Sequence, residues 1–332
     1  MRGFSELKDY VVYVSMWSIY TLRRVIVKQA YFKTVRKCVF KSCYLWHMKY
    51  LVLCLLICSG AYGQDLEAFR IFDSKGKPVT FQKMMSKVSQ NQVVLFGEFH
   101  DNPISHWLEL HVLMELNKQH SGPKMAVGFE MFELHQAKVL NRYIADKSYK
   151  ALKDSTELWS NFKTDYKPVL DSAIAYGNTP FAANVTRKYA SLVFKKGLHA
   201  LDSLPAEQKQ LMAPLPFPFD STLTQYVELI NMGREMHASG INFAHAQAIK
   251  DATMGHSIVQ QLKKSELVYF LNGAFHSDFH QGILWYVQQY APGTKVGTIT
   301  TVSQKDVRKL DKSHLNRADF IIVVNETMTS TH

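Results

Sequence analysis

Residues 92–97 read Gln-Val-Val-Leu-Phe-Gly, an unbroken apolar run that ends at a glycine. Such a run is typical of a strand buried on both faces, as in a parallel sheet. Residues 104–119 follow it with apolar side chains at helical spacing, and a second apolar run begins at residue 125. Strand, helix and strand in this order predict right-handed βαβ units. We therefore expect an α/β fold, a parallel sheet flanked by helices in a three-layer sandwich.

Further runs of the same kind extend the predicted sheet. They are residues 125–129, 179–183, 267–271, 295–300 and 320–324. The segment 134–240 breaks the rhythm, because it holds helical patterns and one strand, near 179–183. The helical patterns are residues 134–145, 155–164, 168–176 and 221–238. We expect residues 64–133 and 241–332 to form the α/β core, with residues 134–240 inserted as a small, mostly helical subdomain.

The composition describes a chain that can bury a core. Of 332 residues, 47% are hydrophobic, which excludes collagen-like and disordered classes. The net charge of +11 is concentrated at the front, where residues 1–50 carry ten Lys and Arg against two acids. Residues 51–332 carry a net charge of only +3, so we expect no nucleic-acid partner.

The N-terminal region has the pattern of an export signal. Residues 48–50 read Met-Lys-Tyr, residues 51–58 are apolar, and Ala61 and Gly63 are small residues at the −3 and −1 positions. This order predicts a signal peptide over residues 48–63, cleaved after Gly63, and residues 1–47 are then a leader or an over-translated segment. Lipidation at Cys58 is the minor alternative, because bulky Ile57 precedes it. We expect an exported protein, periplasmic or associated with the outer membrane.

Cleavage after Gly63 would remove every cysteine, since the four cysteines are Cys38, Cys43, Cys54 and Cys58. The mature chain would therefore have no disulfide and no cysteine nucleophile. It would keep 13 of the 14 histidines, a composition that invites a search for a metal or haem site.

Polar side chains follow four of the predicted strands, where a parallel sheet binds its ligands. They are Glu98 and His100 after the first strand, Glu130 after the second, Asn184 after the third and His276 after the fourth. Imidazole and carboxylate suit divalent Zn, Mn, Co or Fe, so Glu98, His100 and His276 are candidate metal ligands. Glu130 or Glu98 would act as general base in a hydrolase. The alternative is that the glutamates cap helices and the histidines only pack.

Other residues are candidates of a weaker kind. Gln247 and Asp251 share one face of a predicted helix over residues 243–262, either as a buried hydrogen-bonded pair or as support for the site. Tyr166 either packs in the core or lines an apolar ligand pocket, and Arg187 is a candidate partner for haem propionates. His106 and His111, five residues apart, do not share a helix face, and we expect both at the surface, His106 near the edge of the site.

Four segments in chain order carry a family resemblance: residues 94–103 with His106, 128–132, 182–185 and 246–254. Together they resemble the ChaN-like haem-binding uptake proteins, over nearly the whole mature chain. The resemblance implies an exported protein with an α/β core and a small helical domain that binds haem for iron acquisition. It also implies a site between the sheet edge and the helical subdomain, to which Tyr166, Asn184, Arg187, Gln247 and Asp251 are candidate contributors.

The same superfamily includes the Tiki-like metalloproteases, marked by two Gly-x-x-His motifs and a glutamate. Residues 97–100 and 273–276 both fit that motif, although the second departs from the usual ChaN-like sequence. Two hypotheses follow. The first is a haem binder, with a homodimer across the haem site and uptake components as candidate partners. The second is a metal-dependent peptidase or esterase. The order of the motifs favours the haem binder, and an exported scaffold with a vestigial site is a third interpretation.

Overall fold

The computed structural model describes residues 66–120, 125–236 and 239–331, and Glu67–His332 form one compact unit. The predictions for the leader and the signal peptide, on residues 1–63, lie outside the described residues. Within the described ranges, no helix has the length and apolar character needed to cross a membrane.

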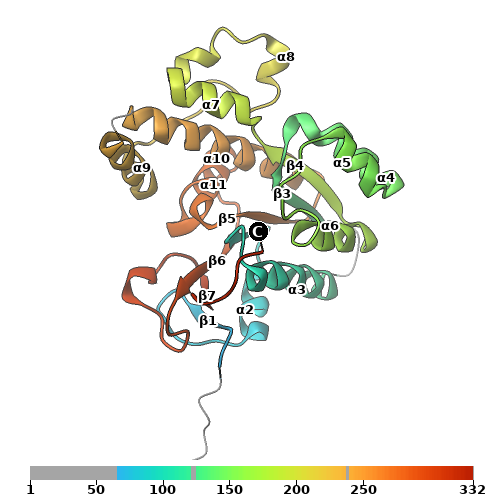
Figure 1. Ribbon diagram of the computed structural model, residues 1–332, viewed down its shortest axis with the longest axis vertical. Coiled ribbons are helices and arrows are strands. Elements are labelled where there is room, and N and C mark those ends of the chain that lie inside the picture. The colour runs from blue at the N-terminus through green and yellow to red at the C-terminus, as the bar shows by residue number, and fades with distance from the viewer. Residues whose placement is uncertain (1–65, 121–124, 237–238, 332) are drawn as a thin grey trace, which may run out of the picture. The chain divides into compact units, whose positions relative to one another are not determined.

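A seven-stranded sheet forms the centre of this unit (Figure 1), in the order β1-β7-β6-β2-β5-β3-β4. The strands are β1 (Phe69–Asp73), β2 (Val93–Glu98), β3 (Met125–Glu133), β4 (Thr179–Asn184), β5 (Leu267–Gly273), β6 (Val296–Gln304) and β7 (Phe320–Asn325). All neighbours pair in parallel except β1, which runs antiparallel to β7 at the edge. The predicted α/β fold is confirmed, and each predicted strand is present. β1 was not predicted, because this half-exposed edge strand contains Arg70 and lacks an unbroken apolar run.

Helices cover both faces of the sheet. They are α2 (Phe81–Val88), α3 (Pro103–Gln119), α4 (Ala137–Asp146), α5 (Tyr149–Ser155), α6 (Tyr166–Ala175), α7 (Arg187–Lys196), α8 (Ala206–Lys209), α9 (Thr224–Glu235), α10 (Gly240–Leu262) and α11 (Ile283–Tyr290). Because side chains alternate along a strand, Val94 and Phe96 of β2 pack with α2, α3 and α6, whereas Val93 and Leu95 pack with α10 and α11. The layers are therefore helix, sheet and helix.

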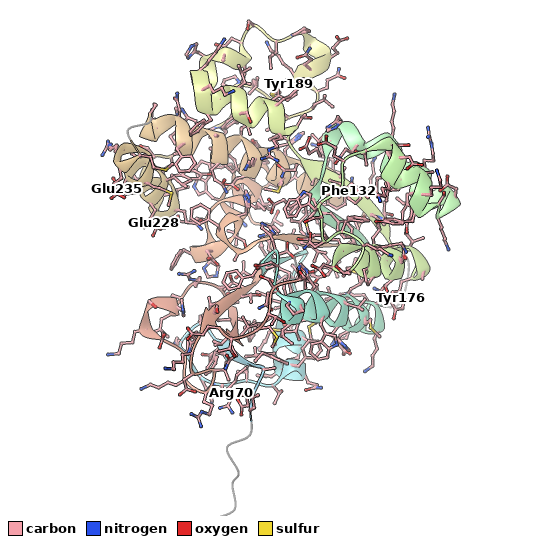
Figure 2. The ribbon with its side chains drawn as sticks, viewed as in Figure 1. Arg70, Phe132, Tyr176, Tyr189, Glu228 and Glu235 are labelled. Atoms are coloured by element: carbon pink, nitrogen blue, oxygen red, sulfur yellow. The ribbon has the colours of Figure 1, made fainter. Side chains whose placement is uncertain are left out.

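Side chains fill the space between these layers (Figure 2). Phe132 is completely buried in the interior, while Tyr176, at the end of α6, is 46% exposed. The helices of residues 134–240 pack in two groups: α4 to α6 join the face that carries α3, and α7 and α9 pack with α10. The limits of the inserted subdomain stay a prediction.

The predicted helix over residues 155–164 is wrong. The helix α5 ends at Ser155, and the chain then runs through a loop and consecutive turns up to α6. Polar side chains replace helical hydrogen bonds in these turns: Asn161 donates to the carbonyl of His100, 2.6 Å away, and Thr164 donates to the carbonyl of Asn161. Asn and Thr side chains that bond to the backbone in this way compete with helix formation.

Two local features bring the ends of the parallel strands together. A Cβ on Gly97 would lie 2.9 Å from the Cα of Ala274, so β2 approaches the segment after β5 as closely as only a glycine allows. The pairing of β3 with β4 shifts register between Phe129 and Glu133, and Glu130 lies within this irregularity. The carboxyl ends of β2, β3, β4 and β5 therefore meet at one edge, where the candidate residues lie.

Candidate functional site

A cavity of about 340 Å³ opens at the carboxyl edge of the sheet. Its lining residues are His100, Glu130, Met131, Glu133, Trp159, Asn184, Val185, Arg187, Lys250 and His276. An adjoining cavity of about 640 Å³ shares Met131, Glu133, Trp159 and Arg187 with it. The two form one groove, which we call the strand-end groove, with polar groups at its base and the cations Arg187 and Lys250 on its wall.

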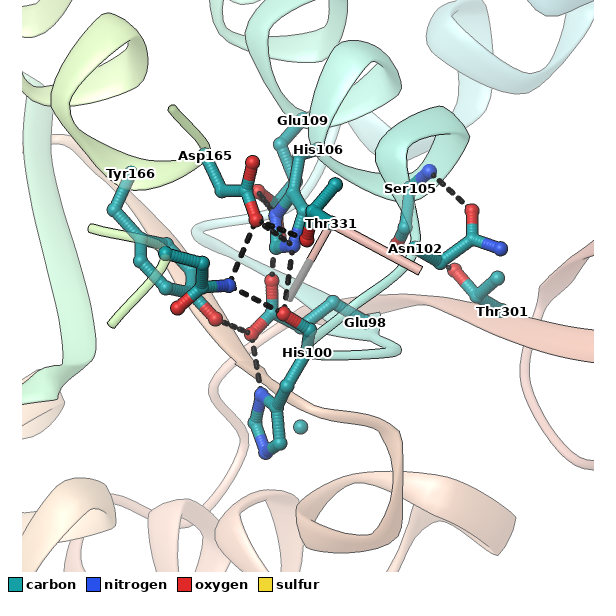
Figure 3. A network of polar contacts seen from close by, with 12 residues as sticks. Glu98, His100, Asn102, Ser105, His106, Glu109, Asp165, Tyr166, Thr301 and Thr331 are labelled. Atoms are coloured by element: carbon teal, nitrogen blue, oxygen red, sulfur yellow. Dashed lines mark hydrogen bonds and ion pairs between the residues drawn. The ribbon is translucent and has the colours of Figure 1, made fainter. Parts of the chain in front are cut away.

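Of the two histidines that line the smaller cavity, His100 is the more accessible, with 41% of its side chain exposed. Its Nδ1 lies 2.6 Å from Oε1 of Glu98 (Figure 3). Its ring makes a T-shaped contact with Trp159, with 4.7 Å between the ring centroids. Burial lowers the pKa of His100, but the Glu98 carboxylate outweighs burial and raises that pKa above its ordinary value. Glu98 thus fixes the ring through Nδ1, and Nε2 is the nitrogen that can meet a ligand.

His276 is buried between two carboxylates. Its Nε2 lies 3.1 Å from Oε1 of Glu130, and its Nδ1 bonds to Oδ1 of Asp251. The amide nitrogen of Gln247 lies 2.9 Å from the same Nδ1. Burial opposes protonation of His276, but Glu130 and Asp251 outweigh it and raise the pKa to about 9. His276 is therefore a protonated, hydrogen-bonded group at neutral pH.

Glu130 connects the two histidines. Burial raises its pKa, but the charges of His276 and His100 and a hydrogen bond from the backbone N–H of Gly273, at 2.7 Å, lower it to about 2. The carboxylate is therefore ionised at the base of the groove. Gly273 lies beside the His100 ring, since a Cβ there would be 2.8 Å from its Cε1 and Nε2.

A second polar cluster, formed by Glu98, His106, Glu109 and Tyr166, lies on the other side of Glu98 from the His100 ring (Figure 3), and its side chains are buried. Tyr166 is completely buried and donates to Glu98 at 2.8 Å. His106 lies between Glu98 and Glu109, with its Nδ1 3.1 Å and 3.0 Å from their nearest oxygens. His106 is only 5% exposed, so the prediction of a surface position for it is wrong. The first turn of α3 points back at the end of β2, and this buries the side chain.

The structure brings most predicted site residues to the groove. His100, Glu130, Asn184, Arg187 and His276 line it. Gln247 and Asp251 reach it through His276, and Glu98 supports it through His100. Tyr166 lies outside the lining and contacts Glu98 instead. The roles assigned to these residues stay predictions.

The donor atoms that lie together are not those of the predicted metal set. Among the described residues, the group with donor atoms all within 4.8 Å of one another is Glu98, His106 and Glu109, rather than Glu98, His100 and His276. Sequence reasoning also missed Lys250, which lines the groove. The position of Lys250, three residues after Gln247 on the same predicted helix, indicates that the two side chains lie close to one helix face and could have identified Lys250.

The sheet is mostly parallel, carries helices on both faces and has a polar groove at the carboxyl ends of its strands. These features define the class of α/β proteins that bind ligands at that edge of the sheet. Residues 84–287 match the family described as haem-binding uptake, Tiki superfamily, ChaN. The match spans more than half of the chain, which therefore belongs to this family.

Solved structures share the fold. The ChaN structure of Campylobacter jejuni, described as showing cofacial heme binding, has a TM-score of 0.60 and 18% identity, over 79% of this chain and 98% of that one. A Bacillus cereus protein has a TM-score of 0.43 and 11% identity, over 74% of this chain and 90% of that one. A variant of the erythromycin esterase EreC in its open conformation has a TM-score of 0.41 and 9% identity, over 78% of this chain and 83% of that one. No curated protein matches the chain. These likenesses describe the fold alone.

Proposed function

We propose that the chain binds haem in the strand-end groove and serves in haem or iron uptake. The observation that carries the proposal is the position of His100, whose Nδ1 is held by Glu98 while the ring lines the cavity that also holds Arg187 and Lys250. An imidazole nitrogen is a common iron ligand, and the iron is what haem would supply to an uptake system. Arginine and lysine suit the two propionates.

The shape and lining of the groove fit such a ligand. Cavities of about 340 and 640 Å³ are in the range of cofactor sites, roughly 300 to 1,000 Å³. Trp159, Met131 and Val185 supply apolar surface, and α7 and α10 supply the cations Arg187 and Lys250. His100 would hold the ligand at the base, with Glu98 fixing the ring, while Arg187 and Lys250 would orient its acidic edge.

The proposal extends to where the protein acts. The signal-like pattern over residues 48–63 supports export, to the periplasm or the outer membrane, with cleavage after Gly63. The name of the Campylobacter relative mentions cofacial heme, which supports testing for a homodimer that encloses two haems. Uptake components of the outer membrane or periplasm are the proposed partners.

Haem titration tests the proposal. Adding haem to the purified, haem-free protein should give a saturable Soret shift, and His100→Ala should change the position of the band and weaken binding at least about tenfold. His111→Ala is the matched control, because His111 lies on α3 against Trp107 and outside the groove lining. A titration without saturation in the wild-type protein would contradict haem binding.

A metal-dependent hydrolase is the second candidate. It is supported by the Asp251–His276–Glu130 chain at the base of the groove, where an ionised carboxylate faces the space a substrate would occupy. In this reaction Glu130, or Glu98, would accept the proton of the attacking water. Hydrolysis of peptides or esters after addition of Mn²⁺, Co²⁺, Fe²⁺ or Zn²⁺, lost in Glu130→Gln, would support it. No turnover with any of these metals would exclude it.

A further inference from the structure

The buried cluster beside His100 brings two carboxyl groups together around one imidazole. Glu98 at the end of β2 and Glu109 on α3 are both buried, and His106 lies between them on α3. Donor atoms of these three residues all lie within 4.8 Å of one another. Glu109 lies on the same α3 face as His106, three residues later, so the helix presents both groups to the end of β2.

Two oxygens of this cluster, Oε1 of Glu109 and Oε2 of Glu98, accept no well-aligned hydrogen bond from any described residue. Both residues are buried, and Oε2 of Glu98 lies 3.1 Å from Nδ1 of His106. A buried carboxylate oxygen without a donor destabilises the folded chain, so such atoms call for a bound proton or cation. Burial and the nearby Glu98 charge also raise the pKa of Glu109 well above its usual value.

The contacts of His106 determine which of its nitrogens can bind a cation. Its Nε2 lies 3.1 Å from the carbonyl oxygen of His100 and 3.5 Å from Oδ2 of Asp165, and both are acceptors. Nε2 therefore carries a proton. Burial lowers the pKa of His106, but Glu109 and Glu98 outweigh it and raise that pKa to about 11, so Nδ1 is protonated as well in the metal-free chain. A cation bound between Glu98 and Glu109 would displace this second proton and take the lone pair of Nδ1. A backbone carbonyl bonded to the outer nitrogen is the usual arrangement around a metal-binding histidine.

We propose that Glu98, His106 and Glu109 form a site for one divalent transition-metal cation of the manganese, iron or zinc class. Two carboxylates and one neutral imidazole carry a charge of −2, which one divalent ion balances, and nitrogen with oxygen ligands suits this class. Without the ion, protons on Glu109 and His106 hold the same atoms together. The site lies below the strand-end groove and is separate from the proposed haem position, and it reaches the groove through the Glu98–His100 bond.

Metal titration of the full chain tests this site in the absence of haem. After removal of metals with a chelator, Mn²⁺ or Zn²⁺ alone should bind with one equivalent per chain by calorimetry and raise the melting temperature. Glu109→Gln should weaken binding more than about 100-fold, since it removes a charged ligand. Glutamine has the size of a protonated glutamate, so this variant should keep its fold and its metal-free melting temperature.

Two further measurements separate this site from its rival. His276→Gln should leave metal affinity unchanged; if it abolishes binding while Glu109→Gln does not, the ion lies at Glu98, His100 and His276, and the proposal is overturned. In the wild-type protein, pulsed electron paramagnetic resonance of bound Mn²⁺ should detect one histidine nitrogen, whereas two would also overturn it. Absence of any tight site for both metals would do the same, and would leave the haem titration unaffected.

Discussion

Glu98 and His100 form the bond that orients the groove: Oε1 of Glu98 lies 2.6 Å from Nδ1 of His100, and the carboxylate is buried while the imidazole is 41% exposed in its side chain. Glu98 also accepts a hydrogen bond from the hydroxyl of Tyr166, so the carboxylate cannot rotate without losing a second hydrogen bond. The position of the exposed ring is therefore set from below by groups that solvent does not reach.

Gly273 sets the position of the same ring from the side. A methyl group there would lie 2.8 Å from Cε1 and Nε2 of His100, and the backbone φ of −57° permits alanine. We expect Gly273→Ala to displace the imidazole and to weaken haem binding about tenfold or more, with a loss of stability of about 1–3 kcal/mol. Haem titration and urea unfolding on the same preparation measure both effects. Wild-type haem affinity in this variant would show that the ring position does not matter.

His276 should make the stability of the metal-free protein depend on alkaline pH. Its pKa is raised to about 9 in the folded chain, against about 6.5 in an unfolded one, so its contribution is fully present below pH 6.5 and is lost as pH rises through 9. The loss should reach at most about 3 kcal/mol. Urea unfolding at pH 7 and pH 10 measures it. His276→Gln should flatten this dependence, and an equally steep profile in that variant would assign the effect to other groups.

Arg187 should contribute to the binding of an anionic ligand. It lines both cavities of the groove, and its charge would pair with a propionate. We expect Arg187→Ala to weaken haem binding about tenfold and to reduce the dependence of affinity on salt. Lys188→Ala is the matched control, because Lys188 is the exposed neighbour whose amine lies over the ring of Tyr189. Equal effects of the two substitutions would indicate a general charge effect and not a contact.

Gly255 allows α10 and α11 to pack closely on one face of the sheet. A Cβ at this position of α10 would lie 2.7 Å from the Cβ of Tyr286 on α11. We expect Gly255→Ala to destabilise the protein by about 1–3 kcal/mol in urea, because this clash exceeds the gain of about 1 kcal/mol that alanine brings to a helix. Gln261→Ala, near the end of the same helix, should stay within about 0.5 kcal/mol of wild type. A stable Gly255→Ala protein would mean that α11 can shift.

The sheet could be predicted from sequence because six of its strands are buried on both faces, so their central residues are mostly apolar. Edge strand β1 could not, because Arg70 and Asp73 interrupt its pattern. The loop before α6 was mistaken for a helix because spacing of apolar residues does not reveal that Asn161 bonds to the distant backbone of His100.

The groove could be predicted in part for a similar reason. Residues just after parallel strands gather at one edge, which placed Glu130, Asn184 and His276 correctly at the sheet edge. The prediction of a surface position for His106 was wrong because it compared the helix face of His106 with that of His111, and this spacing says nothing about burial. The informative pair is His106 with Glu109, three residues apart, one turn after the cap in which Asn102 accepts hydrogen bonds from the N–H groups of Ile104 and Ser105.

The C-terminal segment returns to the site. The N–H of Thr331 bonds to the carbonyl of Asp101 at 2.9 Å, and its hydroxyl donates to Asp165 at 2.7 Å, beside His106. A reporter or affinity tag inserted at Thr331 would break these bonds beside the site. The turn at Pro292 and Gly293 is exposed and precedes β6 at the opposite end of the strands, so a tag inserted there would leave the site intact.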